Sequence, residues 1–181
     1  MNSQCYVAFL RGINVGRAKR IAMADLRTLV EGLGCTGVRS VLNSGNVVFR
    51  AAGTTAQDVA AAIEEALVLK LGVAARVFVL DHAALSGVMA GNPLLGVATD
   101  HARLIVFLLA EAVQRDKLAP LDSQDWGHER LALGERAAYV WCPEGILDSA
   151  AATSLGKLLG DGTTSRNWNT LVKLHALCAE T

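Results

Sequence analysis

The chain has 181 residues, a length typical of one ordinary domain or of two small packed halves. Hydrophobic residues make up 52% of it and charged residues 19%, with 3 prolines, which excludes a disordered or fibrous chain. Its 17 Lys and Arg balance 17 Asp and Glu, so a strongly basic protein that wraps nucleic acid is not expected.

The first eighty residues alternate between short apolar runs and stretches with the apolar spacing of a helix. Apolar or β-branched runs of strand length occupy residues 4–10, 38–42, 46–50 and 76–80. Apolar residues recur at helical spacing between Met23 and Leu33, and again after the capping pattern Thr55-x-x-Asp58. The resulting order, β-α-β-β-α-β, predicts a ferredoxin-like unit.

The second half repeats this order in part. Strands are expected at 103–109, near 130–133 and at 137–142, and helices at 111–118, 149–159 and 166–178. Residues 81–100 hold a helix-like stretch and then an Asn-Pro turn, which we interpret as a connector. We therefore expect an α+β fold with a ferredoxin-like half (1–82) and a second, partly repeated α+β half (83–181) packed on it as one compact unit.

Two patterns indicate that the halves pack together. The odd and the even positions of the run from Cys5 to Leu10 are both apolar, so both faces of this strand need a cover. Residues 1–90 hold 9 Lys and Arg against 6 Asp and Glu, a net charge of +3, whereas residues 91–181 hold 8 against 11, a net charge of −3. We expect the second half to cover the second face of the first sheet.

Targeting and cysteine patterns favour a cytoplasmic protein. The longest apolar run, residues 104–110, is far shorter than the roughly 20 residues of a membrane helix, and residues 1–4 lack the basic start of a signal peptide. The cysteines lie at scattered positions without the paired spacing of a zinc or redox site: Cys5, Cys35, Cys142 and Cys178. We expect reduced, mostly buried thiols, no metal site and no cofactor.

The loop after the first strand, residues 10–20, is the most informative stretch for function. It contains Gly12 and Gly16 and four cationic side chains, those of Arg11, Arg17, Lys19 and Arg20. Backbone amides freed by glycine beside a helix N-terminus can hold an anion, and arginine suits phosphate or carboxylate. The loop matches neither a Walker loop nor a dinucleotide-binding fingerprint. The alternative is a solvated loop whose glycines serve only to turn the chain.

The segment Asn43-Ser44-Gly45-Asn46 is a second candidate feature. The first and third strands of a ferredoxin-like sheet are adjacent and antiparallel, so Arg11 and Asn14 should lie beside Ser44 and Asn46 at one sheet edge. The two segments would then form one polar site. Alternatively, Ser44 and Asn46 only close the hairpin through bonds to the backbone.

The segment 163–170, TTSRNWNT, is the third candidate feature. Its hydroxyl residues at 163–165 predict a helix cap, with Arg166, Asn167 and Asn169 in the first helical turn. Arg166 and Asn169 would share a helix face and could line a site or tie the helix end to the rest, whereas Trp168 is expected in the core.

Familiar catalytic patterns are absent from the sequence. The four histidines lie in unrelated contexts, and neither H-E-x-x-H nor G-x-S-x-G occurs. Asp122, Asp125, His128 and Glu129 fall in a polar stretch that is typical of solvated surface. No cysteine has an activating neighbour in sequence. The sequence therefore identifies no catalytic residue and leaves open whether the protein is an enzyme.

The segments YVAFLRGINVG, MADLRTLVEGLG, VLNSGNVVF, NPL and TSRNWNTLVKL occur in this order over nearly the whole chain. Together they resemble the bacterial family called domain of unknown function 1697. The resemblance implies an α+β fold with ferredoxin-like substructure and no established activity, substrate or cofactor. It also implies characteristic polar positions at Arg11, Gly12, Asn14, Gly16, Ser44, Gly45, Asn46, Arg166, Asn167, Trp168 and Asn169. The chain departs from the family pattern at Arg17, where a second glycine is frequent, and at Leu94, where an aromatic is frequent.

Three functions are compatible with these observations. The favoured one is binding of a small anionic ligand, bearing phosphate or carboxylate, at Arg11, Gly12, Asn14, Gly16, Ser44, Asn46, Arg166, Asn167 and Asn169. The first alternative is a protein interaction module in which these residues join the halves. The second is RNA binding, for which Tyr6 of the first strand could stack on a base. It is disfavoured because Asn46 and Val48 occupy the stacking positions of the third strand, both sheet faces have an apolar pattern and the net charge is zero.

Overall fold

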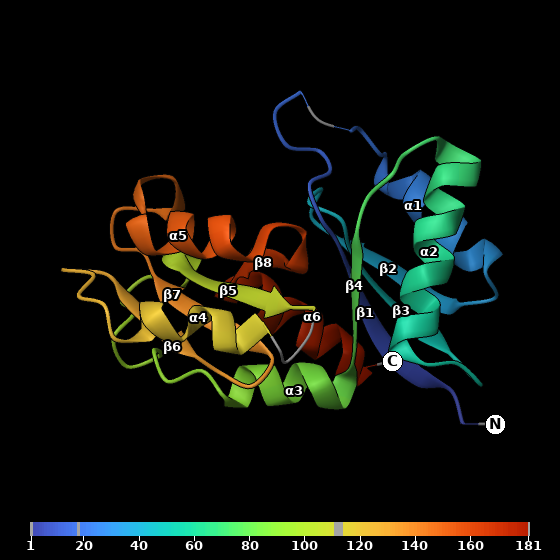
Figure 1. Cartoon of the computed structure of the whole chain (residues 1–181). Helices are drawn as coiled ribbons and strands as arrows, with labels where there is room; N and C mark the ends of the chain where they lie inside the picture. Colours follow the sequence, from blue (N-terminus) through green and yellow to red (C-terminus); the bar gives the residue numbers. More distant parts are fainter. Residues whose placement is uncertain (1, 18, 111–113, 181) are drawn as a thin grey trace. The chain divides into compact units, whose positions relative to one another are not determined.

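The computed structural model describes residues 2–17, 19–110 and 114–180 (Figure 1). The chain forms two compact units. Unit 1 comprises Met1–Leu85 together with Lys173–Thr181, and unit 2 comprises Ser86–Val172. The C-terminal residues thus belong with the first half of the chain, not with the second half as the sequence analysis divided it.

Unit 1 contains a four-stranded antiparallel sheet in the order β2-β3-β1-β4. Its elements follow the predicted β-α-β-β-α-β order: β1 (Gln4–Leu10), α1 (Met23–Gly32), β2 (Thr36–Val41), β3 (Asn46–Ala51), α2 (Ala56–Leu71) and β4 (Val77–Asp81). The mixed α+β class is confirmed, and so is the expected antiparallel pairing of the first and third strands, in which Val7 lies opposite Val48.

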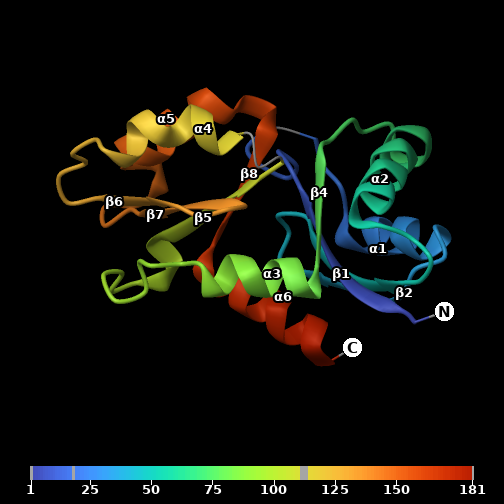
Figure 2. The same cartoon turned by 60° about the horizontal axis from the view of Figure 1, so that its bottom comes forward.

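One face of the unit 1 sheet packs on both helices, which lie on the same side of it in Figures 1 and 2. Leu26 and Leu29 of α1 and Ile63 and Leu67 of α2 are buried in this core. The sheet contributes the side chains that point the same way: Tyr6, Ala8, Leu10, Val47, Phe49, Val77 and Val79. As predicted, the Thr55 hydroxyl caps α2 by accepting from the amide of Asp58 at 3.1 Å. Burial of this apolar stripe is the main term that holds the two helices on the sheet.

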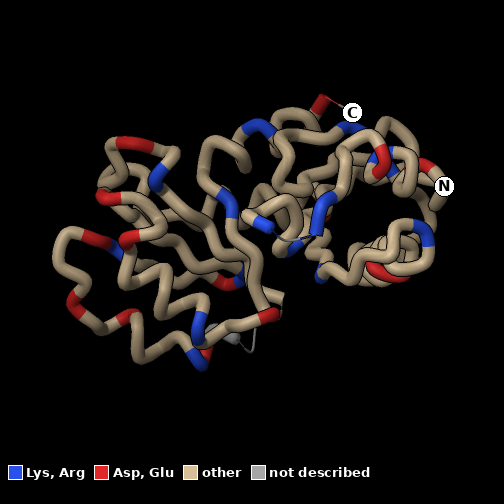
Figure 3. The backbone as a smooth tube through the Cα atoms, turned by 90° about the horizontal axis from the view of Figure 1, so that it is seen from above, with Lys and Arg blue, Asp and Glu red and all other residues tan. Residues whose placement is uncertain are grey.

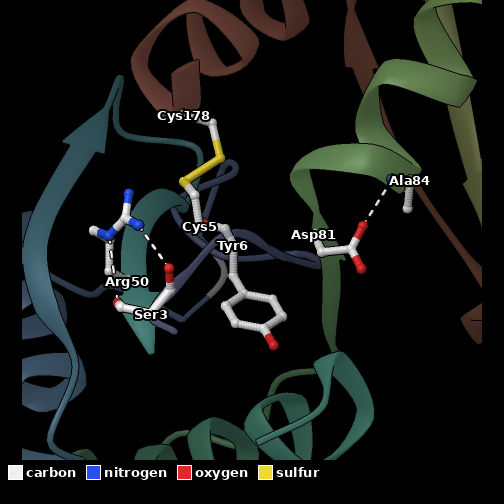
Figure 4. Close-up of a disulfide and its surroundings, with 7 residues drawn as sticks. All are labelled: Ser3, Cys5, Tyr6, Arg50, Asp81, Ala84 and Cys178. Atoms are coloured by element: carbon white, nitrogen blue, oxygen red, sulfur yellow. Dashed lines mark hydrogen bonds between the residues drawn. A yellow bond between two sulfur atoms is a disulfide. The ribbon is translucent and has the colours of Figure 1, made fainter. Parts of the chain in front are cut away.

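The opposite face of the same sheet is also buried, and the end of α6 (Trp168–Glu180) lies on it. Cys5 of β1 forms a disulfide with Cys178 of α6, whereas the neighbouring Tyr6 points to the other side of the strand (Figure 4). The expectation that all four cysteines are reduced is therefore wrong for this pair. The sequence could not reveal it, because the two residues are 173 positions apart. Cys35 and Cys142 are free and buried, as expected.

Unit 2 repeats the arrangement, with a second antiparallel sheet in the order β6-β7-β5-β8. Its strands are β5 (Leu104–Leu109), β6 (Arg130–Leu133), β7 (Ala137–Trp141) and β8 (Thr163–Asn167). The helices α4 (Gln114–Asp122) and α5 (Ala150–Leu159) supply Leu118, Leu121, Leu155 and Leu159 to the core. Helix α3 (His82–Ala90) lies in the predicted connector. Of the predicted helix 111–118, residues 111–113 lie outside the described residues.

The start of the last helix differs from the prediction. Thr163 to Ser165 do not cap a helix, and Arg166 does not lie in a helical turn, because Thr163–Asn167 forms β8 beside β5. This long-range pairing, with Arg166 opposite Val106, overrides the local capping pattern. Helix α6 starts at Trp168, which is buried as expected. The sequence therefore predicted only part of the repeat, whereas unit 2 has all four strands.

No helix among the described residues has the length and apolar character needed to cross a lipid bilayer.

Candidate functional site

The loop after β1 and the turn before β3 meet in unit 1, as the topology predicted. The amide of Leu10, the last residue of β1, donates to the carbonyl oxygen of Gly45 at 2.9 Å. The next amide, that of Arg11, donates to the carbonyl oxygen of Arg76 beside β4 at 2.8 Å. These bonds place the start of the loop between the turn and the start of β4.

Asn14 holds the loop in shape from within. Its side-chain Nδ2 donates to the carbonyl oxygens of Ile21 and Asn43, at 2.9 Å and 2.8 Å, while its Oδ1 accepts from the amide of Ile21 at 2.8 Å. Asn14 adopts φ 55°, a left-handed conformation that asparagine tolerates better than most residues. Its amide group thus closes the loop on itself and ties it to the turn.

Asn46 and Ser44 stabilise the turn. Asn46 is fully buried, and its Nδ2 donates to the carbonyl oxygen of Val41 at 2.9 Å and to the hydroxyl oxygen of Ser44 at 2.8 Å. Both side-chain donors of Asn46 are therefore used inside the protein. This agrees with the alternative in which Ser44 and Asn46 close the hairpin.

The outer part of the loop is exposed and cationic. Arg17, Lys19 and Arg20 are exposed, and Arg11 is half-buried. Arg20 Nη2 donates to the carbonyl oxygen of Gly16 at 2.7 Å, and Lys19 Nζ donates to the carbonyl oxygen of Ala74. Residues 10–22 contain no Asp or Glu. We call residues 11–20 the cationic loop; Figure 3 shows how Lys and Arg (blue) and Asp and Glu (red) are distributed along the chain.

Backbone geometry explains the two glycines of the cationic loop. Gly12 and Gly16 are exposed and have φ values of 67° and 56°, in the left-handed region that glycine reaches without strain. A Cβ at either position would meet no atom within 4 Å. Conformation therefore accounts for glycine here, and crowding does not.

Arg76 is a cationic residue of this sheet edge that the sequence analysis missed. Its carbonyl bonds to Arg11, its Nε lies 3.8 Å from Glu64 Oε1, and its guanidinium carbon lies 5.9 Å from the centroid of the Phe78 ring. The expected antiparallel pairing of β1 with β4 could have identified Arg76, because this pairing brings the residue before β4 to the end of β1.

The other predicted site residues belong to unit 2. Arg166 Nη1 donates to Thr164 Oγ1 at 2.9 Å and to the carbonyl oxygen of Ser165 at 2.8 Å, and burial lowers the pKa of Arg166 to about 10. The Oδ1 of Asn167 accepts from the amide and the hydroxyl of Thr170, both at 2.9 Å, so Asn167 acts as the N-cap of α6. Asn169 is exposed.

Catalytic and metal-binding arrangements have little support in the described part of the chain. Three or more His, Cys, Asp or Glu side chains do not gather there as a metal ion would require. Burial raises the pKa of the Cys35 thiol, and burial is also the main cause of the raised pKa of Cys142. Both thiols are thus held in the unreactive protonated form.

Tyr6 is not available for base stacking. It is buried in the helix-facing core, its ring stacks on Phe49 with centroids 5.9 Å apart, and its hydroxyl donates to the carbonyl oxygen of Thr54 at 2.9 Å. The interpretation that Tyr6 could serve as a base-stacking aromatic in the first strand is therefore wrong.

Comparison with known proteins places the chain in a family. A search of curated proteins finds no match. A solved structure described as that of the conserved bacterial protein SP0830 from Streptococcus pneumoniae has the same fold, with a TM-score of 0.79 at 24% identity, over 98% of this chain and 99% of that one. The family model described as protein of unknown function (DUF1697) matches residues 3–139. Because this match spans most of the chain, the protein belongs to the DUF1697 family.

Proposed function

We propose that unit 1 binds a small anionic ligand, bearing phosphate or carboxylate, at the cationic loop. The observation that carries the proposal is that one set of side chains in this region forms internal hydrogen bonds while another set is cationic and exposed. Asn14 and Asn46 form the internal bonds that shape the loop and the turn, whereas Arg17, Lys19 and Arg20 are exposed on the outer side. A loop built in this way presents several positive charges that lie close together in the sequence.

The chemistry of the loop suits an anion. Arginine offers a planar fork of N–H donors that matches phosphate and carboxylate oxygens, and lysine adds a point charge. Gly12 and Gly16 have positive φ values, a conformation in which successive backbone amides can point at an anion. The absence of Asp and Glu from residues 10–22 leaves no carboxylate within the loop to compete with the ligand.

The roles of the proposed site residues therefore differ. Asn14, Ser44 and Asn46 act as framework, Gly12 and Gly16 as turning points, and Arg11, Arg17, Lys19 and Arg20 as the charges that meet the ligand. Arg166 belongs to unit 2 and is proposed as a separate candidate for anion binding. Asn167 is occupied as the cap of α6, so its part is to stabilise that helix.

Thermal-shift titration with phosphorylated and carboxylated metabolites tests the proposal. We expect the wild-type protein to be stabilised by at least one of them, and the variants Arg11→Met and Arg17→Met to bind it about tenfold more weakly, the effect of losing a charge-assisted hydrogen bond. Arg39→Met is the matched control, because Arg39 is an exposed arginine of β2 in the same unit. Arg166→Met tests the separate candidate in unit 2 with the same compounds.

Two outcomes would contradict the proposal. If no compound stabilises the wild-type protein and Arg11→Met only lowers its stability, the residues serve as internal connections, as expected of an interaction module. If the protein instead retains RNA on a filter in a salt-dependent manner, and the loop variants abolish this, the anion is a nucleic-acid backbone.

A further inference from the structure

We propose that the Cys5–Cys178 disulfide is a redox-controlled cross-link. It holds the end of α6 on the unit 1 sheet, and a dithiol reductant cleaves it. We call Lys173–Glu180 the terminal segment. Cys5 and Leu10 lie five residues apart on β1, about 17 Å at the usual rise of a strand. The disulfide is therefore remote from the cationic loop, and the proposal does not depend on anion binding.

The terminal segment crosses the sheet face opposite α1 and α2. The ring of His175 stacks on that of His82, which follows β4, with centroids 4.9 Å apart and an interplanar angle of 19°. Cys178 is bonded to Cys5 of β1 (Figure 4). Glu180 Oε2 lies 3.8 Å from Nη1 of Arg39 in β2. Because the sheet order is β2-β3-β1-β4, these contacts follow one another from β4 across β1 to β2.

Strand pairing places these contacts on one face. Arg39 lies opposite Val48, and Val48 lies opposite Val7, so the three side chains point the same way. Val7 and Cys5 are two residues apart on β1 and share this face. The side chains of the helix-facing core, such as Tyr6 and Val47, point the other way. The terminal segment thus covers part of the face that the sequence analysis expected the second half to cover.

Two residues of the terminal segment are buried and two are half-buried. Leu174 and Cys178 are its buried residues, and they lie four positions apart on one side of the helix. The ion pair between Arg39 and Glu180 has side chains 54% and 65% exposed, a setting in which such pairs contribute little. The disulfide adds a covalent link between the segment and β1, and we expect its loss to release the segment.

The opening reaction is thiol–disulfide exchange with a dithiol. A thiolate of the reductant attacks one sulfur of the disulfide and forms a mixed disulfide, while the other sulfur leaves as a thiolate that takes up a proton. The second thiol of the reductant, after losing its proton, attacks the mixed disulfide and displaces the remaining cysteine sulfur. Two electrons pass from the dithiol, which becomes a disulfide, and Cys5 and Cys178 become thiols.

Burial couples this reaction to movement of the terminal segment. Cys5 and Cys178 are 6% and 4% exposed, so a reductant gains access when the last turn of α6 lifts from the sheet. Once Cys5 and Cys178 are reduced, this covalent bond no longer returns the segment to the sheet. Cys35 and Cys142 are buried free thiols with raised pKa values and serve as internal controls that should not exchange.

Thiol trapping tests the bond. The native full-length protein is equilibrated with oxidised glutathione, denatured in iodoacetamide and mapped by mass spectrometry. We expect alkylation of Cys35 and Cys142 and a linked pair of peptides that contain Cys5 and Cys178. Incubation of the native protein with dithiothreitol should then expose Cys5 and Cys178 to alkylation. Recovery of unlinked Cys5 and Cys178 before reduction, or resistance of the link to dithiothreitol until the protein is denatured, would overturn the proposal.

Hydrogen exchange tests the release. Amides of the terminal segment should exchange about tenfold faster, or more, in the reduced than in the oxidised wild-type protein, with α1 and α2 unchanged. The double variant Cys5→Ser/Cys178→Ser should match the reduced protein in both redox conditions, and Cys35→Ser should respond as the wild type does. Equal exchange in the oxidised and reduced wild-type protein would show that the disulfide does not hold the segment. This comparison needs no substitution, so a variant that fails to fold leaves the test intact.

Discussion

Gly45 lies in the turn before β3, next to the cationic loop. Its backbone is in the left-handed region, and the surrounding atoms leave no space for a side chain. Its φ is 85°, and a Cβ would lie 2.8 Å from Ile13 Cδ1 and 2.9 Å from Leu10 Cβ. The sequence identified this residue as part of a hairpin turn. The close approach of Ile13 could not be predicted, because it depends on how the loop folds back over the turn.

Replacing Gly45 with alanine should therefore destabilise unit 1. We expect Gly45→Ala to lower the free energy of unfolding by about 2–4 kcal/mol, from left-handed strain and overpacking together. Gly16→Ala is the control, because Gly16 also has positive φ but open space around it, and should cost about 1 kcal/mol. Urea denaturation measures both values. Equal losses would mean that crowding at Gly45 contributes nothing.

The position of Asn14 near the turn could be predicted from the sequence, but the hydrogen bonds of its side chain could not. Strand topology was sufficient to predict that Asn14 lies near the turn, and the bond to Asn43 confirms it. The sequence did not show that its amide group would be used internally, in bonds to Ile21 and Asn43. Those bonds depend on the left-handed backbone at Asn14, which no spacing pattern reveals.

At the scale of elements, most strands and helices were predictable because their apolar spacing is regular. The exception is β8, whose sequence, Thr-Thr-Ser-Arg-Asn, has the hydroxyl residues typical of a helix cap. Pairing with β5, nearly sixty residues earlier, makes it a strand. The cap is instead Asn167, two residues further on than the predicted cap segment.

Helix α6 should be sensitive to the loss of this cap. Asn167→Ala removes the acceptor for the amide and hydroxyl of Thr170, and we expect it to lower the free energy of unfolding by about 1 kcal/mol. Asn169→Ala, an exposed position two residues later, should change it by less than about 0.5 kcal/mol. Chemical denaturation of the two variants distinguishes them, and a larger effect at Asn169 would contradict the assignment of the cap.

The contact between α6 and the start of α3 should make stability depend on pH. Burial, and then the neighbouring His82, lower the pKa of His175 below its usual 6.5. As pH falls below 6.5, the unfolded chain takes up a proton that the folded protein resists, so the free energy of unfolding should decrease. Above that pH this residue contributes no pH dependence.

His175→Gln tests this expectation. Denaturation between about pH 7 and pH 5 should give a shallower loss of stability for the variant than for the wild type. His128→Gln is the control for replacement of a histidine, because His128 is exposed and lies in unit 2. A His175→Gln variant with the wild-type slope would show that His175 does not titrate as described.

At the scale of the whole molecule, the family motifs and the repeated order of elements predicted an α+β chain with two related halves. The return of the C-terminus to unit 1 was not predictable. A helical pattern over residues 166–178 shows that a helix forms there, but it does not show which sheet its last turn meets. The scattered cysteines gave no pairing signal either, since Cys5 and Cys178 stand near opposite ends of the chain.

The disulfide should contribute strongly to the stability of the whole chain. Because it constrains the unfolded state, dithiothreitol should lower the free energy of unfolding by about 2–5 kcal/mol. The double variant Cys5→Ser/Cys178→Ser should be less stable than the oxidised wild type by a similar amount and should not respond to dithiothreitol. Guanidinium denaturation with and without reductant provides the comparison. A wild-type protein of unchanged stability under reducing conditions would contradict this expectation.

A bond between positions 5 and 178 also turns almost the entire polypeptide into a covalent ring. A single protease cut at any point between these positions would leave both fragments attached to each other. Such nicked material would migrate as one species on a denaturing gel without reductant and as two species once reductant is added. The oxidised protein can thus tolerate a break in its backbone without losing a fragment.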